Sequence, residues 1–73
     1  MSAFYKRTLG IPISLNQETE EGLTAIPGIG KKMSRVIIEE RRKRGGFADI
    51  NELLTIDGIG EGLFKRIVSY ATL

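Results

Sequence analysis

The sequence predicts an all-α domain made of two copies of one helical unit. Residues 23–30 (LTAIPGIG) align with residues 53–60 (LLTIDGIG) at an offset of 30, and the register continues with Met33 opposite Leu63 and Ile37 opposite Ile67. In both copies Gly-Ile-Gly separates segments whose apolar residues recur three and four apart, which is the spacing of an amphipathic helix. Each copy is therefore expected to form a short helix, a tight glycine turn and a longer helix.

The first copy carries helix start and stop signals. Thr19, followed by two glutamates, predicts an N-cap and a short helix from about Glu20 to Ala25, which Gly22 weakens. The longer helix should run from about Lys31 to Arg44. It ends in basic residues followed by Gly45-Gly46, which supplies the left-handed residue that helix ends commonly need.

The second copy carries equivalent signals. Asp49 and Glu52 have the spacing of a capping box, so a third helix should open at about Ile50. A fourth should run from about Glu61 to Tyr70. Residues 1–13 are predicted to be an N-terminal arm and residues 14–73 the domain. In an alternative interpretation, apolar residues near the start (Phe4, Leu9, Ile11 and Ile13) cover part of the core.

Composition excludes several functions. A chain of 73 residues makes one small domain. It has no cysteine and no histidine, so disulfides, the usual zinc sites and Ser-His or Cys-His dyads are excluded. The carboxylates Glu20, Glu21, Asp57 and Glu61 show no metal-ligand pairing and are interpreted as caps and solvated charge. We expect no enzyme activity, no metal, no cofactor and no small-molecule substrate. No apolar run approaches the roughly 20 residues that span a bilayer, so we expect a soluble chain without membrane contact of its own.

The glycine turns and the basic residues beside them are candidate phosphate sites. Unpartnered N–H groups at a helix N-terminus, together with the helix dipole, favour an anion. Residues 31–44 hold seven Lys/Arg against two glutamates, a net +5 in a chain of net +2. At 100° per residue Lys31, Arg35 and Arg42 share a narrow arc opposite Met33, which predicts a continuous basic edge that starts at the first turn. The alternative is that the turns only connect helices and the cations form a solvated face.

These residues resemble a known family. The pattern of Leu15-Asn16, residues 23–30, Ile37-Ile38, Arg41, Gly46-Phe47, Glu52-Leu53-Leu54 and residues 56–60 resembles the tandem helix-hairpin-helix domain of ComEA-type competence proteins. The resemblance covers residues 13–72. It implies a compact four- to five-helix domain of two helix-hairpin-helix repeats, a SAM-like bundle, that binds double-stranded DNA without sequence preference as a monomer. The two hairpins would grip phosphates of both strands across the minor groove.

The resemblance also implies a role and a place. ComEA-type proteins are receptors for DNA uptake tethered outside the cytoplasmic membrane, so the family suggests the periplasmic or extracellular side of a bacterial membrane. The expected DNA-binding residues are Gly28, Ile29, Gly30, Lys31, Lys32, Arg35, Arg42, Gly58, Ile59, Gly60 and Lys65. The isoleucines between the glycines are also expected to be buried as anchors of the turns, and the glycines to permit positive φ and close approach of the backbone to another molecule.

This chain departs from the family pattern at several positions. Gly22 stands where a glutamate is usual and Glu40 where an aromatic residue is common. In the second repeat Asp57 replaces the proline of the first copy, and Glu61 follows the hairpin. We therefore expect the first hairpin to dominate DNA binding. Asp57 and Glu61 also favour an alternative function as a protein–protein interaction or assembly module. A nuclease is the weakest alternative.

Overall fold

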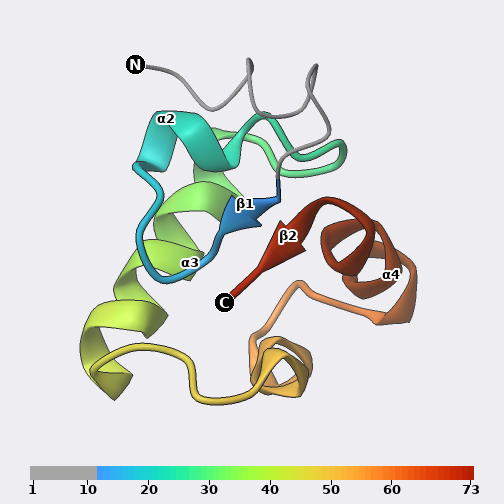
Figure 1. Ribbon diagram of the computed structural model, residues 1–73. Coiled ribbons are helices and arrows are strands. Elements are labelled where there is room, and N and C mark those ends of the chain that lie inside the picture. Colours follow the sequence, from blue (N-terminus) through green and yellow to red (C-terminus); the bar gives the residue numbers. More distant parts are fainter. Residues whose placement is uncertain (1–11) are drawn as a thin grey trace.

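The computed structural model describes residues 12–73 and confirms the all-α prediction (Figure 1). The order of elements is β1 (Ile13–Ser14), α2 (Glu20–Leu23), α3 (Lys31–Arg44), the 3-10 helix η1 (Ile50–Thr55), α4 (Glu61–Tyr70) and β2 (Ala71–Thr72). The only addition to the helices within the described residues is a small parallel pairing of β1 with β2. The first repeat is α2, a turn and α3, and the second is η1, a turn and α4.

The short helix of the first repeat is capped as predicted but ends early. Thr19 Oγ1 accepts a hydrogen bond from the Gly22 N–H at 3.0 Å. The helix ends at Leu23 rather than Ala25, because the chain tightens into i to i+3 bonds such as Ala25 N–H to Gly22 O at 3.1 Å. A Cβ at Gly22 would collide with the Glu18 carboxylate. Glycine at this position therefore leaves room for the Glu18 side chain as it lies in the structure.

The two long helices have the predicted bounds, whereas the third predicted helix is of a tighter type. α3 ends at Gly45 with a φ of 69°, in the left-handed region. η1 begins at Ile50, and its capping box is formed by Asp49 and Glu52. It is a 3-10 helix of only six residues, and its end leads directly into the second turn through the bond from Ile56 N–H to Leu53 O at 3.1 Å.

Both repeats contribute to one hydrophobic core. Its fully buried large apolar residues are Ile13, Leu15, Leu23, Ile26, Ile37, Leu53 and Ile67. Ile13 therefore covers the core, as the alternative interpretation of the N-terminal residues expected for this position; Phe4, Leu9 and Ile11 lie outside the described residues. None of the helices in residues 12–73 is long and apolar enough to cross a membrane.

The ends of the described chain are tied to each other and to the core. In the parallel pair, Ile13 lies opposite Ala71 and Ser14 opposite Thr72. Ser14 Oγ donates to Leu73 O at 2.8 Å, and the Leu15 N–H donates to Thr72 O at 2.8 Å. Because these residues come from opposite ends of the sequence, the pairing closes the first repeat onto the second.

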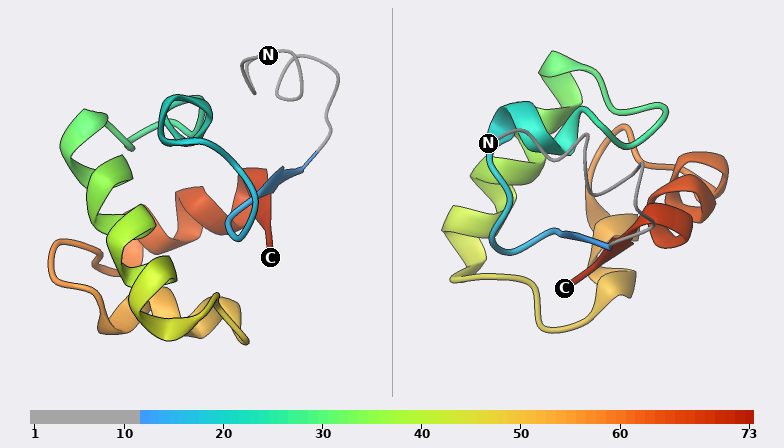
Figure 2. Two further views of the ribbon diagram at one scale, coloured as in Figure 1. Left: turned by 90° about the vertical axis from the view of Figure 1, so that its left-hand side faces the viewer. Right: turned by 45° about the horizontal axis from the view of Figure 1, so that its top comes forward.

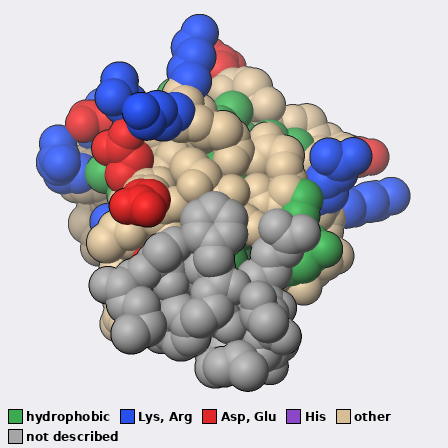
Figure 3. Space-filling model, turned by 90° about the horizontal axis from the view of Figure 1, so that it is seen from above, with side chains coloured by type: hydrophobic (Ala, Val, Ile, Leu, Met, Phe, Trp, Pro, Cys, Tyr) green, Lys and Arg blue, Asp and Glu red, His purple; other side chains and the backbone are tan. Residues whose placement is uncertain are grey.

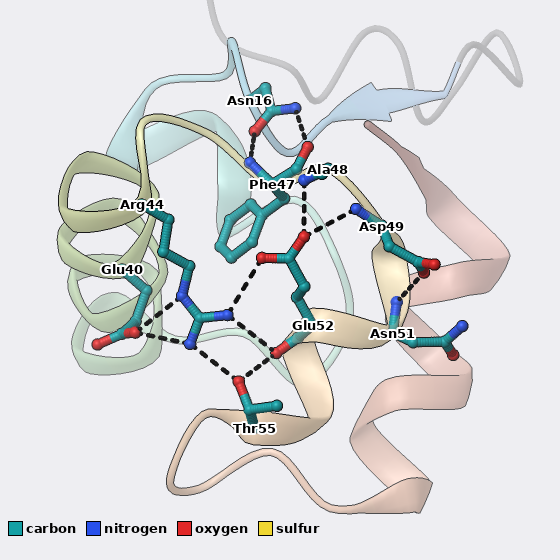
Figure 4. Close-up of polar contacts among 9 residues, drawn as sticks. All are labelled: Asn16, Glu40, Arg44, Phe47, Ala48, Asp49, Asn51, Glu52 and Thr55. Carbon is teal, nitrogen blue, oxygen red and sulfur yellow. Dashed lines mark hydrogen bonds and ion pairs between the residues drawn. The ribbon is translucent and has the colours of Figure 1, made fainter.

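The connection between the repeats is held by the Asn16 side-chain amide, which bonds to both backbone groups of one residue, as a neighbouring strand would (Figure 4). Its Oδ1 accepts from the Phe47 N–H at 2.7 Å, and its Nδ2 donates to Phe47 O at 3.0 Å. Arg41 of α3 holds the same N-terminal segment by donating to Leu15 O at 3.0 Å and Glu18 O at 2.8 Å. Asn16 and Arg41 are thus structural residues of the linker region.

Arg44 joins α3 to η1 through a polar cluster (Figure 4). Its guanidinium donates to Glu40 at 2.9 Å, to the Glu52 carboxylate at 3.3 Å and to Thr55 Oγ1 at 2.8 Å. Hydrogen bonds from the backbone N–H groups of Asp49 and Ala48, with help from Arg44, lower the pKa of Glu52. Glu40, found where the family commonly has an aromatic residue, serves this cluster.

Candidate nucleic-acid interface

The two glycine turns have nearly identical backbones. Gly28 and Gly58, the first glycine of each turn, both have a φ of 95°. The N–H of the following isoleucine bonds back within each turn, from Ile29 to Ile26 O at 3.0 Å and from Ile59 to Ile56 O at 3.1 Å. Ile29 and Ile59 are buried. They anchor the turns as expected, and, with their side chains buried and their N–H groups already bonded, they are poorly placed as the DNA contacts that the sequence analysis also assigned to them.

The second glycine of each turn differs from expectation. Gly30 and Gly60 have extended backbones, with φ of −91° and −93°, so positive φ is not the reason for glycine there. A Cβ built at either position would have no atom within 4 Å. Both glycines are exposed, and the space in front of them is open.

Open helix N-termini follow each turn. Gly30 is the N-cap of α3 and Gly60 that of α4, and neither helix start has a side-chain cap hydrogen bond. The first N–H groups of a helix have no partner inside the helix, and the dipole places partial positive charge at them. The described structure therefore has two helix starts with the same backbone geometry and no side-chain cap, and helix starts of this kind favour anions.

The two hairpins are fixed relative to each other by reciprocal side-chain packing. Figure 2 shows the backbones of the two repeats from two further sides. A Cβ at Gly28 would lie 3.0 Å from Leu63 Cδ1 of α4, and a Cβ at Gly58 would lie 2.8 Å from Met33 Cε of α3. Met33 and Leu63 are the equivalent residues of the two repeats. Each turn thus packs on the long helix of the other repeat, and the separation of the two helix starts is set by the core.

The predicted basic edge of α3 is interrupted by carboxylates. Arg35 pairs with Glu20 of α2 at 2.9 Å, and Arg42 pairs with Glu39 at 2.9 Å. In Figure 3 acidic side chains lie among the basic ones on the α3 side of the molecule, at the left. The pairs are well exposed, and exposed ion pairs contribute only about 0–1 kcal/mol. Both arginines can therefore leave their ion pairs at little cost in free energy, but each is paired with a glutamate in the structure.

Four cations of the described chain have neither an ion pair nor a side-chain hydrogen bond within residues 12–73: Lys31, Lys32, Lys65 and Arg66. All four are exposed. They lie in the first two turns of α3 and α4, the helices that begin at the open glycines. The unopposed positive charge therefore gathers near the hairpins rather than along α3.

Sequence reasoning missed Arg66. Its Nη1 lies 3.3 Å from the position of a Cβ on Gly28, so the α4 side chain reaches the turn of the other repeat. The repeat register gives no hint of it, because the equivalent residue of the first copy is Val36. The one available signal was its position three residues after Leu63, because residues three apart lie on the same face of a helix. Within residues 12–73 no group of His, Cys, Asp or Glu side chains is arranged to hold a metal ion.

Comparison with known proteins agrees with this architecture. The family model for the helix-hairpin-helix motif matches residues 10–72. ComE operon protein 1 of Bacillus subtilis is 34% identical over 64 residues, which cover 88% of this chain and 31% of that protein.

Two further relatives are larger proteins. Human endonuclease/exonuclease/phosphatase family domain-containing protein 1 is 35% identical over 55 residues (75% of this chain, 10% of that protein). The DNA ligase of Fervidobacterium nodosum is 43% identical over 47 residues (62% of this chain, 7% of the ligase). The chain thus spans less than a third of each relative. The match of the family model over nearly the whole sequence, together with the paired glycine turns, shows that the chain belongs to the helix-hairpin-helix family.

Proposed function

We propose that this chain binds double-stranded DNA without sequence preference by holding backbone phosphates at the N-terminal ends of α3 and α4. The observation that carries the proposal is the pair of exposed glycine N-caps, Gly30 and Gly60, with no side-chain cap and no neighbour in front of them. Backbone N–H groups and the helix dipole favour a phosphate there, and glycine lets it approach closely.

Two features favour a polyanion over a single small anion. The reciprocal contacts of Gly28 with Leu63 and Gly58 with Met33 hold two such sites at one separation, which suits a ligand with repeated phosphates. The unopposed cations near both helix starts add attraction without fixed geometry. Because backbone N–H groups and lysines contact phosphates rather than base edges, we expect little dependence on sequence.

Membership of the helix-hairpin-helix family and similarity to a DNA ligase support DNA as the polyanion. Similarity to ComE operon protein 1 and the resemblance to ComEA-type competence proteins support a finer role, DNA uptake. We propose binding without catalysis, since the chain matches only 10% and 7% of the relatives whose names denote enzymes.

One observation favours the alternative, a protein-interaction module. Leu54 of η1 and Val68 of α4 are 42% and 44% exposed, and both belong to the second repeat, which also carries Asp57 and Glu61. A protein partner would bury such exposed apolar side chains, whereas phosphate binding would not use them.

A charge-reversal pair on one helix tests the proposal. Lys32→Glu and Lys43→Glu change the net charge equally, but Lys32 lies in the first turn of α3 and lines a groove with Gly58, whereas Lys43 is near the far end. In titrations of the full chain with labelled duplex DNA, we expect Lys32→Glu to weaken binding at least about tenfold, equal to about 1.4 kcal/mol. Lys43→Glu should change it much less.

The second hairpin has its own test. Glu61→Lys should raise DNA affinity, because it removes a negative charge from the first turn of α4. Equal losses for the two lysine reversals, with no effect of Glu61→Lys, would mean that the hairpins only connect helices. If the unmodified chain bound no duplex DNA at all, the protein-interaction alternative would replace DNA binding.

A further inference from the structure

We infer that a basic side chain of each repeat lies at the hairpin of the other repeat, and that Arg66 of the second repeat completes the phosphate site of the first hairpin. This inference rests on the proposed function and deepens it. It assigns a residue that neither the repeat pattern nor the basic edge of α3 contains.

Arg66 is placed against the first turn by its own helix. Measured to the position of a Cβ on Gly28, Arg66 Nη1 lies at 3.3 Å and Arg66 Cδ at 3.6 Å. Leu63, one turn earlier on α4, touches the same position at 3.0 Å. The Arg66 side chain thus lies along the turn, while the residue stays exposed and has no ion pair or side-chain hydrogen bond within residues 12–73.

The lysines of α3 line hollows beside the first turn, whereas Arg66 lies against Gly28 itself. Lys31 has no ion pair within residues 12–73, and it shares a surface hollow with Glu20, Glu21 and Thr24 of the α2 segment. Lys32 lines a groove between the two turns, together with Gly30 of the first turn and Asp57 and Gly58 of the second. Of the four unpaired cations, Arg66 is the one in contact with Gly28.

A basic side chain of the first repeat also lies near the second hairpin. Lys32, from the first repeat, lies beside the second hairpin, whose own helix begins with Glu61-Gly62. This placement brings a cation of the first repeat close to the second turn, beside Asp57. The expectation that the first hairpin dominates counted for each hairpin only the charges that follow it in sequence, and it stays a prediction for the variants below to test.

An arginine suits the first site because its planar guanidinium can donate two parallel hydrogen bonds to one phosphate. The variant Arg66→Gln removes the charge but keeps most of the stem that packs on Gly28 and Leu63. Lys43→Gln is the control for net charge, because it removes one exposed positive charge near the far end of α3, where Lys43 pairs with Glu40 at 3.7 Å. Thermal melting of both variants checks that the fold is retained.

In anisotropy titrations of the full chain with a labelled duplex, Arg66→Gln should weaken binding about tenfold and reduce the salt slope by about one unit. Lys43→Gln should change affinity less than about twofold, as expected for a charge that touches no phosphate. Arg66→Lys should recover part of the lost affinity, since lysine restores the charge but cannot donate the two parallel hydrogen bonds of a guanidinium.

A double-mutant cycle locates the effect. Arg66→Gln should be non-additive with Gly30→Ala at the first hairpin and additive with Gly60→Ala at the second. Native affinity for Arg66→Gln, or coupling to Gly60 instead of Gly30, would overturn the inference while leaving DNA binding intact. Absence of DNA binding by the unmodified chain would instead overturn the proposed function, and the inference with it.

Discussion

Alanine at Gly28 and alanine at Gly30 should have opposite consequences, although the two glycines stand two residues apart in one turn. Gly28 has a φ of 95°, and its Cβ would press on Leu63 at 3.0 Å. Gly30 has a φ of −91° and no neighbour within 4 Å. The first glycine serves the fold, and the second leaves room for a ligand.

The magnitudes follow from these geometries. Left-handed backbone strain makes Gly28→Ala cost about 1–3 kcal/mol of unfolding free energy. In a domain of this size each kcal/mol lowers Tm by about 4–8 °C. For Gly30→Ala, the loss of a glycine N-cap lowers the unfolding free energy by about 1 kcal/mol or less. Alanine also lowers the conformational entropy of the unfolded chain, which raises the unfolding free energy by about 0.4–1 kcal/mol. Its Tm should therefore stay within a few degrees of the native value.

DNA binding should show the reverse order. The methyl group of Gly30→Ala occupies the space in which a phosphate oxygen would meet the first N–H groups of α3. Loss of one hydrogen bond to a charged group costs about 1.5–3 kcal/mol, or about 10- to 150-fold in Kd. Melting by circular dichroism and anisotropy titration with duplex DNA measure the two effects on the same samples. Native affinity in a fully folded Gly30→Ala variant would refute a phosphate site at this helix start.

Three further predictions concern the fold. A fragment ending at Arg44 should not melt cooperatively, because each turn packs on the long helix of the other repeat; a sharp two-state transition would contradict the shared core. Asn16→Ala should lower the unfolding free energy by about 1–3 kcal/mol in denaturant titrations, since it leaves the partly buried Phe47 N–H and C=O without their partner, and an unchanged midpoint would show that the amide is dispensable. The lowered pKa of Glu52 adds stability above its ordinary value of 4.5, and this stability is lost as the pH falls through the folded pKa. In the variant Glu52→Gln, Tm should therefore fall less steeply as the pH is lowered through the acid range. If Tm of the variant fell as steeply as that of the native chain, Glu52 would not be the source of this acid sensitivity.

The sequence predicted the long helices well because their end signals are local. α3 and α4 each begin after Gly-Ile-Gly, and α3 stops at a glycine whose left-handed φ the pattern required. α2 and η1 were predicted less well in length and type. Both lead within a few residues into a turn whose geometry is set by packing on the other repeat, and that constraint is not written in their own residues.

The site was predicted in part. The glycine turns follow from the repeat, and the lysines of α3 from their place directly after the first turn. The positive φ expected for Gly30 and Gly60 was wrong, because both have an extended backbone. Glu20, which pairs with Arg35 at 2.9 Å, comes from another helix, so a helical projection of α3 alone could not reveal it. Arg66 reaches Gly28 only through the crossed packing of the repeats. The β1–β2 pairing joins residues such as Ile13 and Ala71, and strands of two residues carry no periodic signal.

The salt dependence of duplex DNA binding tests the central claim most directly. If the four unopposed cations each engage one phosphate, log K against log salt concentration should have a slope of about −4. The slope should be the same for unrelated duplexes, because the contacts avoid base edges. A slope near zero, or strong binding to one duplex and not to others, would contradict an interface built from helix starts and unpaired cations.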